Sequence, residues 1–257
     1  MPDTRRHRGP HPDDAKLFAE SRRPALRTAV GELSWLLTRG YAEDSSLALV
    51  GNRHELTERQ RMAVRRCACS DKSLAGRRRT QRPLDACLDR PLAVDGYNLL
   101  ITIESALSGG VVLVGRDGCH RDLASIHGTY RQVEETGPAL LLIADYLRQA
   151  GVREVVWFLD RPVSNSGRLR GFMEAALADS SIRWAVELVD NPDPVLADYD
   201  GAAASSDSWI LDSCRAWTNL VAEIIDARLP DRWRLDLRSE DDAESDVVPR
   251  PAAPRET

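Results

Sequence analysis

The sequence predicts an α/β protein with a mainly parallel sheet over residues 91–238, preceded by a small all-helical region over residues 15–90. Two patterns support this fold class. From residue 91 onward, short apolar stretches alternate with helical stretches of roughly 10 to 15 residues, which is typical of βαβ units. Before residue 91, apolar residues recur at helical spacing instead. With 257 residues and 42% hydrophobic content, the chain can bury one large core or two smaller ones.

The first region begins with a polar, proline-containing segment, residues 1–14, which we expect to be flexible. Residues 26–40 place leucines and valines at helical spacing and end in glycine, which predicts a helix. Residues 57–68 predict a second helix, because Thr57 and Gln60 stand at capping-box spacing.

This second helix is strongly basic, and the sequence "GRRRTQRP" at residues 76–83 predicts an exposed basic linker. Residues 1–90 carry 19 Lys and Arg against 12 Asp and Glu, a balance of +7, whereas residues 91–257 carry 16 against 28, a balance of −12. This asymmetry favours a basic first region that binds a polyanion, joined to an acidic second region that binds cations. The alternative is that both regions have solvated charged surfaces that bind no partner. The candidate phosphate-contacting residues are Arg65, Arg66, Arg77, Arg78 and Arg79.

The α/β region opens with a strand at residues 92–95 that runs directly into a helix. The glycine-bounded apolar run at residues 108–118 predicts a hairpin or an edge insertion. Residues 121–135 predict a helix. Residues 136–151 predict another, with a proline near its start and a glycine at its end.

Two further buried strands, over residues 152–160 and 182–190, flank a helix over residues 166–180. A short strand of small residues at 202–205 then precedes a helix that starts near Asp207. The last apolar stretch, "WTNLVAEIIDARLP", fits either a strand or a helix.

The ends of the chain and its cysteines bear on its environment. Residues 239–257 are acidic and then proline-rich, so we expect a disordered tail. The N-terminal sequence lacks the apolar core of a signal peptide, and no run of about 18 apolar residues predicts a membrane span. The five cysteines match no zinc pattern, and we interpret them as reduced, buried thiols. We therefore expect a cytoplasmic protein without membrane or disulfide partners, and a homo-oligomer stays open.

Aspartates follow the ends of the predicted strands. Asp95, Asp160 and Asp190 each end a strand, and Asp207 follows another by two residues. In a parallel sheet these ends share one edge, where ligands bind. Clustered carboxylates raise one another's pKa unless a cation compensates, and carboxylate oxygens suit Mg²⁺ or Mn²⁺. The alternative is that each aspartate only caps the helix after it.

Polar side chains beside these acids complete the predicted site. Asn98 follows Asp95, and Ser206 precedes Asp207, so both could orient a water or a ligand. A metal held by such acids polarises a phosphoryl oxygen and activates water for displacement. We therefore assign Asp95, Asn98, Asp160, Ser206 and Asp207 to catalysis.

A second candidate binding element is the loop "RPVSNSGRL", residues 161–169, between a strand and a helix. Arg161, Ser164 and Ser166 could hold an anion at the N-terminus of that helix. The alternative is an ordinary loop with a serine cap. Arg131, in "HGTYRQVEE", stands on a predicted helical face and is a further substrate-binding candidate, unless that face is a salt-bridged surface.

Three stretches resemble PIN-like nuclease domains, especially their NYN branch: "VDGYNLL", "VVWFLDRP" and "AAASSDSWIL". The resemblance covers about residues 91–215. It implies a PIN-like three-layer α/β/α fold and a metal-dependent ribonuclease site, with Asp95, Asp160 and Asp207 as the metal ligands. The remaining acid of the site stays open among Asp190, Asp193, Asp198, Asp200 and Asp212.

The whole chain also resembles the prokaryotic family "domain of unknown function 434", through stretches such as "LSWLLTRGY", "LTERQRMAVRRCACSD" and "LDRPVSNSGRL". That family implies no activity. The function we expect is therefore a Mg²⁺- or Mn²⁺-dependent nuclease that acts on RNA through a metal-activated water. The alternatives are a non-catalytic nucleic-acid-binding protein with the same fold, and an enzyme acting on a small phosphorylated ligand.

Overall fold

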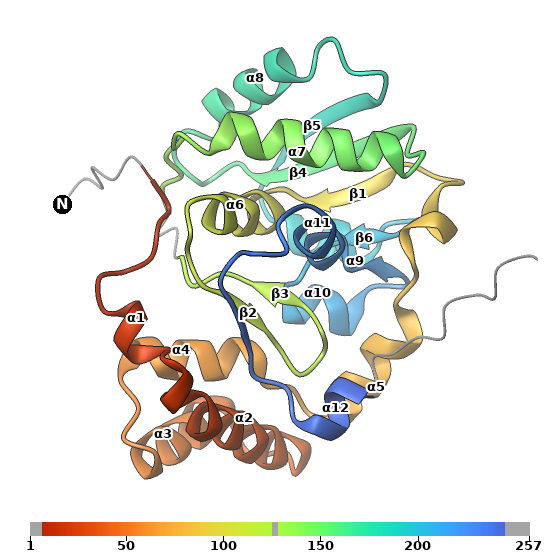
Figure 1. The fold of residues 1–257 in the computed structure, drawn as a ribbon. Helices are drawn as coiled ribbons and strands as arrows, with labels where there is room; N and C mark the ends of the chain where they lie inside the picture. The colour runs from red at the N-terminus through yellow and green to blue at the C-terminus, as the bar shows by residue number, and fades with distance from the viewer. Residues whose placement is uncertain (1–6, 125–127, 245–257) are drawn as a thin grey trace, which may run out of the picture.

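The computed structural model describes residues 7–124 and 128–244, and in this part of the chain the strands form two sheets (Figure 1). The larger sheet has the order β5-β4-β1-β6-β7, and all its pairings are parallel. The smaller sheet has the order β3-β2-β8. The strands of the larger sheet are β1 (Leu92–Asp95), β4 (Glu154–Asp160), β5 (Arg183–Val189), β6 (Ala203–Ala204) and β7 (Trp217–Thr218). Those of the smaller sheet are β2 (Val112–Val114), β3 (His120–Arg121) and β8 (Arg234–Asp236).

The order of the larger sheet places β1 at its centre. The chain adds β4 and β5 on one side of β1, then crosses to the other side and adds β6 and β7. The direction of winding therefore reverses between β1 and β6. In open parallel sheets, ligands bind outside the carboxyl ends of the strands at such a reversal.

Helices cover both faces of the larger sheet. One face carries α6 (Gly96–Leu107), α7 (Thr136–Gln149), α8 (Ser166–Ala176) and α11 (Leu220–Arg228), and the other carries α9 (Pro192–Ala197) and α10 (Ser208–Ser213). Strand residues alternate between the two faces. Leu92 and Val94 accordingly pack with the first group of helices, whereas Ala93 packs with the second. The predicted α/β class with a mainly parallel sheet is confirmed.

The N-terminal region is helical, as predicted, but it shares its core with the smaller sheet. Its α-helices are α1 (Asp14–Leu17), α2 (Arg23–Thr38), α3 (Glu43–Arg53), α4 (Glu58–Cys67) and α5 (Asp71–Thr80), and its 3-10 helices are Glu20–Arg22 and Leu84–Cys87. Leu113 of β2 and Leu235 of β8 belong to the same apolar cluster as the buried residues of α2, α3 and α4. Figure 1 shows these helices below the smaller sheet.

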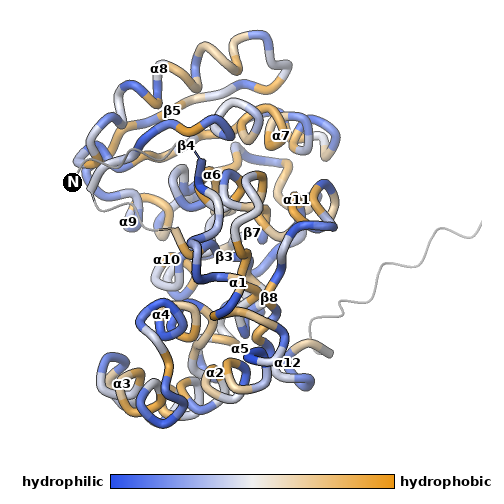
Figure 2. The backbone as a smooth tube through the Cα atoms, turned by 60° about the vertical axis from the view of Figure 1, so that its left-hand side comes forward, coloured by the Kyte–Doolittle hydropathy of each residue, from blue (hydrophilic) through white to orange (hydrophobic). Residues whose placement is uncertain are grey.

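Helix α4 begins as the sequence predicts. The Thr57 side chain accepts a hydrogen bond from the Gln60 amide, and the Gln60 side chain accepts one from the Thr57 amide. This capping box satisfies two amides that would otherwise lack partners in the first turn. Figure 2 shows α4 mainly in the hydrophilic colour, in keeping with its arginines.

Two predicted elements are wrong. Residues 76–80 are not a linker but the end of α5, in which Arg77 is 3% exposed. One arginine of the basic run is therefore buried, because Arg77 forms ion pairs with Asp117 and Asp212. Residues 121–135 are not a helix: β3 covers His120–Arg121, and residues 128–135 form no helix. Tyr130 instead lies buried, with its hydroxyl 2.5 Å from Glu104 Oε1. Residues 125–127 lie outside the described residues.

The ends of the chain also differ from expectation where they are described. Arg8 forms an ion pair with the buried Glu104, and Asp14 forms one with Arg59, so residues 7–14 are anchored. The open choice at residues 217–230 resolves into both elements, β7 and then α11. Glu240–Glu244 form α12, and residues 245–257 of the expected tail lie outside the described residues. No described helix has the length and apolar character needed to cross a membrane.

Candidate functional site at the carboxyl edge of the sheet

The candidate site forms where the ends of β1 and β6 meet. Asp95 is the last residue of β1, and Gly96 begins α6 immediately after it. A Cβ atom on Gly96 would lie 2.8 Å from the Phe158 carbonyl oxygen, closer than real side chains come. Glycine is therefore required here because the start of α6 passes directly against β4.

Hydrogen bonds join the two predicted motifs into one unit. Ser205 Oγ donates to Asp95 Oδ2 over 2.7 Å and accepts from the Asp207 amide over 3.0 Å. Asn98 Oδ1 accepts from both the amide and the hydroxyl of Ser206, each over 2.9 Å. The segment 95–98 and the segment 205–207, about 110 residues apart in sequence, thus hold each other in place.

The acids at this edge influence one another. Burial raises the pKa of the Asp95 carboxyl to about 7; the hydrogen bond from Ser205 opposes this shift, and the negative charges of Asp207 and Asp193 add to it. Burial also raises the pKa of Asp193, with Asp207 and Asp160 adding to the effect. The pKa of Asp160 is raised by burial as well. Four carboxyl groups therefore lie within electrostatic reach along one edge.

Among the five acids left open by the sequence, Asp193 is the one coupled to the strand-end aspartates. It lies in the first turn of α9, whose N-cap is Asn191. Asp190 pairs with Arg161, and Asp212 pairs with Arg77. Asp200 pairs with Arg90, so the charges of these three acids are locally balanced.

The donor set fits a hydrated divalent cation and not a fully enclosed ion. No three His, Cys, Asp or Glu residues in the described parts of the chain are grouped closely enough to hold one metal together. Asp207 Oδ1 also accepts from the Trp209 and Ile210 amides, so it caps α10, as the alternative interpretation had it. Mg²⁺ usually keeps several waters and binds one or two carboxylates. Repelling, part-buried carboxylates are the condition that such a cation relieves.

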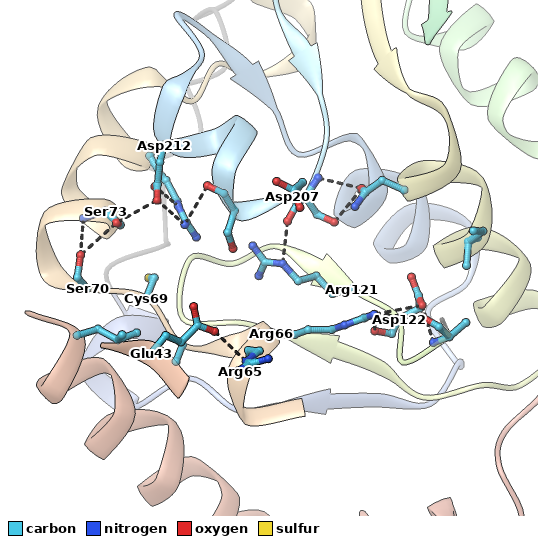
Figure 3. A pocket seen from close by; sticks show the side chains of 18 of the residues that line it. Glu43, Arg65, Arg66, Cys69, Ser70, Ser73, Arg121, Asp122, Asp207 and Asp212 are labelled. Carbon is cyan, nitrogen blue, oxygen red and sulfur yellow. Dashed lines mark hydrogen bonds and ion pairs between the residues drawn. The ribbon is translucent and has the colours of Figure 1, made fainter. Parts of the chain in front are cut away.

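A cleft of about 830 Å³ lies beside this edge, between it and the helical region (Figure 3). Asn98, Ser206 and Asp207 line it on the side of the sheet. Arg65 and Arg66 of α4 line it on the opposite side, and Figure 3 shows Arg121 between them and Asp207. The structure thus brings three of the predicted catalytic residues to one cavity with Arg65 and Arg66, whereas Asp95 and Asp160 do not line it.

A buried ionic network supports this cleft. Asp117, with its side chain 2% exposed, accepts two hydrogen bonds from Arg121, over 2.8 and 2.7 Å, and one from Arg77 over 2.5 Å. These guanidinium groups hold the pKa of Asp117 well below its usual range, against the effect of burial. Arg77 also donates to Asp212 over 2.7 Å. Arg121 Nε donates to the Ser206 carbonyl over 2.8 Å, so the network reaches the site itself.

Arg121 is the site residue that the sequence does not reveal. Its partners Asp117 and Ser206 come from the hairpin turn and from the end of β6. The four-residue spacing of Asp117 and Arg121 is the one local signal, and it does not indicate Ser206.

The predicted phosphate-contacting arginines take different places. Arg65 pairs at the surface with Glu43 and Asp44. Arg66 donates to the Asp122 carboxylate over 3.3 Å and to the Ala124 carbonyl over 3.1 Å. Arg77 is buried, so its assignment as a phosphate contact is wrong: its donors are committed to Asp117 and Asp212.

Arg78 and Arg79 are exposed and lie outside the lining of the cleft. Arg78 Nη2 donates to the Asp242 carbonyl over 3.3 Å. The cleft therefore receives two surface-accessible arginines, both from α4, whereas Arg78 and Arg79 of α5 lie outside it.

The predicted anion-binding loop is held by internal contacts. The Ser164 amide donates to the Gly128 carbonyl over 3.0 Å, and Ser166 Oγ donates to the Arg161 carbonyl over 3.1 Å. Arg161 pairs with Asp190. None of these residues, all of them described, lines the cleft.

Arg131 is not brought to the sheet edge either. It lies in a non-helical segment, so the predicted helical face does not exist. Its carbonyl accepts from Arg8, and it lines a smaller pocket of about 260 Å³ beside residues 7–11.

The fold and the site together define an α/β protein with a carboxylate-bearing sheet edge facing a basic helical wall. The chain belongs to the family described as "Domain of unknown function (DUF5616)", whose model matches residues 84–223. Residues 25–80 match the model described as "Protein of unknown function (DUF434)". The resemblance to that second family is thus confirmed for the helical region, while the α/β region matches the first.

A relative shares both regions. The chain is 28% identical over 204 residues to "Uncharacterized protein MJ0935" of Methanocaldococcus jannaschii. The aligned residues make up 79% of this chain and 97% of the relative. No solved structure matches the chain significantly. The match to the helical region ends at residue 80, the last residue of α5, and the match to the α/β region begins at residue 84, where the 3-10 helix Leu84–Cys87 starts.

Proposed function

We propose that this protein is a Mg²⁺- or Mn²⁺-dependent nuclease that hydrolyses phosphodiester bonds in RNA. One observation carries the proposal. Asp95 ends the central strand at the point where the winding of the sheet reverses, and its pKa is raised by burial and further by the charges of Asp207 and Asp193. Buried groups with strongly perturbed pKa values are typical of functional sites.

One or two of the four acids Asp95, Asp160, Asp193 and Asp207 would bind the cation directly, and the others would act through its retained waters. When bound, such a cation polarises a phosphoryl oxygen and lowers the pKa of a water nucleophile. The chain itself orients these groups: Ser205 fixes the Asp95 carboxylate, and Arg121 fixes the carbonyl of Ser206.

Asn98 has a different role from a metal ligand. Its Oδ1 accepts two hydrogen bonds from Ser206, one of them from a backbone amide, so this atom must be the oxygen. Its NH₂ group therefore points away from Ser206 and is a donor. A donor beside the carboxylates suits a phosphoryl oxygen of the substrate.

The resemblance to PIN-like nuclease domains supports the proposal. Its first and last matching stretches, "VDGYNLL" and "AAASSDSWIL", supply the four residues Asp95, Asn98, Ser205 and Ser206 that are hydrogen-bonded to one another. Motifs that meet in space at a ligand-binding edge are more specific than motifs that only match in sequence.

The test is Asp95→Asn, compared with Asp190→Asn. Asp95 ends β1 and Asp190 directly follows β5 of the same sheet, but Asp190 is exposed and paired with Arg161. Asp95→Asn should lower Mn²⁺ affinity by more than roughly a hundredfold, beyond what an outer-shell partner contributes, and abolish RNA cleavage. Asp190→Asn should leave both unchanged.

Calorimetric titration with Mn²⁺, a cleavage assay on single-stranded RNA and a thermal melt measure these effects. A folded Asp95→Asn variant that binds Mn²⁺ as tightly as the wild type would refute the metal site. RNA binding without cleavage in the wild type would instead indicate the non-catalytic nucleic-acid-binding protein.

A further inference from the structure

The cleft beside the carboxylate edge has the size of a small-ligand site. Its volume of about 830 Å³ falls within the range of roughly 300 to 1,000 Å³ that is typical of pockets for small molecules. One wall comes from the first turn of α6 and residues 206–208, and the opposite wall comes from α4 and residues 68–70. The helical region therefore supplies one wall of the cleft.

The wall formed by α4 offers two arginines with different constraints. Arg66 is held by the Asp122 carboxylate and the Ala124 carbonyl, so its position is set before a ligand arrives. Arg65 is 43% exposed, and its partners Glu43 and Asp44 are 51% and 91% exposed. Surface pairs of this kind contribute little stability, so an anionic ligand can replace them.

The opposite wall offers a further donor. The Asn98 NH₂ group has no hydrogen-bond partner among residues 7–124 and 128–244, because Ser206 occupies only its oxygen. The lining of the cleft also contains apolar side chains, which can cover the body of a ligand. They belong to Leu37, Ala68, Tyr97, Ile101 and Ala124.

The charge of the cleft is balanced. Its lining contains four arginines and four acidic residues: Arg65, Arg66, Arg77 and Arg121, with Glu43, Asp122, Asp207 and Asp212. A surface that tracks a polyanion needs an excess of positive charge along its length. This lining has no such excess, so it favours a ligand with one phosphate at the basic wall.

We infer that the cleft binds a single phosphorylated nucleotide, either free or as the phosphorylated end of a single strand. This inference rests on the proposed function, because it names the substrate class of the same site. The phosphate contacts Arg65 and Arg66, the base and ribose contact the apolar side chains, and the Asn98 amide donates to an oxygen of the ligand.

The first experiment compares AMP with adenosine by calorimetry on the full chain in the presence of Mn²⁺. AMP should bind at least tenfold more tightly than adenosine. Arg65→Ala should weaken AMP binding about tenfold. The matched control is Arg53→Ala, since Arg53 is an exposed arginine of the same region, paired with Glu32 and outside the cleft. It should leave AMP binding unchanged, and both variants should melt like the wild type.

The second experiment separates the two sources of the nucleotide. A tetraribonucleotide with a 5′-phosphate is compared with AMP and with the same strand lacking the phosphate. Tighter binding of the phosphorylated strand than of AMP identifies a strand end, and equal or weaker binding identifies a free nucleotide. Three results would overturn the inference. They are equal affinity for AMP and adenosine, an AMP affinity that Arg65→Ala leaves unchanged, and tight binding of the strand without its phosphate.

Failure of the inference and failure of the nuclease proposal give different results. Asp95→Asn should retain AMP binding, because Arg65 and Arg66 are untouched, while it loses cleavage. A wild-type protein that binds AMP but does not cleave RNA would leave the cleft inference standing and overturn the nuclease.

Discussion

Asp95 shows how one residue changes character in the fold. In sequence it is an ordinary aspartate before a glycine. In the structure, burial and the nearby charges of Asp207 and Asp193 raise its pKa to about 7, although Ser205 donates a hydrogen bond to it. Its charge state therefore changes near neutral pH.

This shift predicts a pH dependence of metal binding. A cation must displace the proton from Asp95, so Mn²⁺ affinity should rise with pH, by up to about tenfold per unit, and level off above about 7. The raised pKa also means that, without metal, the folded state binds more protons than the unfolded state between about 4 and 7. The contribution of Asp95 to stability is thus present at low pH and is lost as pH rises through 7.

Mn²⁺ titrations and urea unfolding curves between pH 5 and 8 measure both trends. Asp95→Asn should remove this component from the stability profile. A wild-type Mn²⁺ affinity that does not change over this range would contradict the assignment of Asp95 as a ligand.

Arg121 is predicted to stabilise the fold and the site together. Arg121→Met would leave the buried Asp117 with Arg77 as its remaining arginine partner and would remove the donor to the Ser206 carbonyl. Breaking a buried ion pair costs about 3 to 5 kcal/mol of unfolding free energy. Arg170→Met is the control, because Arg170 and Glu174 form an exposed pair, whose loss should leave the stability nearly unchanged. Equal losses in denaturant unfolding would show that the Asp117 network is not stabilising.

At the scale of elements, the junction of β1 and α6 is the tightest point of the site. Strand β1 has four residues, and α6 begins without a connecting loop. The first turn of α6 therefore passes close to the backbone of β4, and Gly96 is the residue that permits this approach.

Gly96→Ala is therefore expected to destabilise the protein. Its Cβ would meet a backbone oxygen of Phe158, which cannot move aside as a flexible side chain does, and such overpacking costs roughly 1 to 3 kcal/mol. Gly167→Ala in α8 is the control, because nothing lies within 4 Å of its Cβ position. Thermal melts compare the two, and a neutral Gly96→Ala would show that α6 can shift away from β4.

At the scale of the whole molecule, the two family matches correspond to regions that are joined by more than a linker. The helices of the N-terminal region share an apolar cluster with β2 and β8. Arg77 of α5 reaches Asp117 in the hairpin turn and Asp212 in α10. One wall of the cleft also belongs to the helical region.

We therefore predict that residues 84–257 do not fold cooperatively alone. Without the helical region, Leu113 and Leu235 lose their apolar neighbours, and Asp117 loses Arg77. Circular dichroism melts of this fragment should show a broad, weakened transition, and adding the separate fragment 1–83 should restore part of it. A sharp transition near the melting temperature of the full chain would contradict the prediction.

The sequence by itself determined the elements whose signals are local. The alternation of strands and helices after residue 91, the capping box of α4 and the aspartates at strand ends follow from periodicity and spacing, and the structure contains them. Only the tertiary structure decided the pairings that these local signals leave open. In the structure, Arg77 is buried in an ion pair with Asp117, and Arg121 donates a hydrogen bond to the Ser206 carbonyl. Asp193 is the acid whose pKa depends on the charges of the strand-end aspartates. The physical reason is that ion pairs and pKa shifts depend on distances between residues far apart in the chain, and the strand order sets those distances.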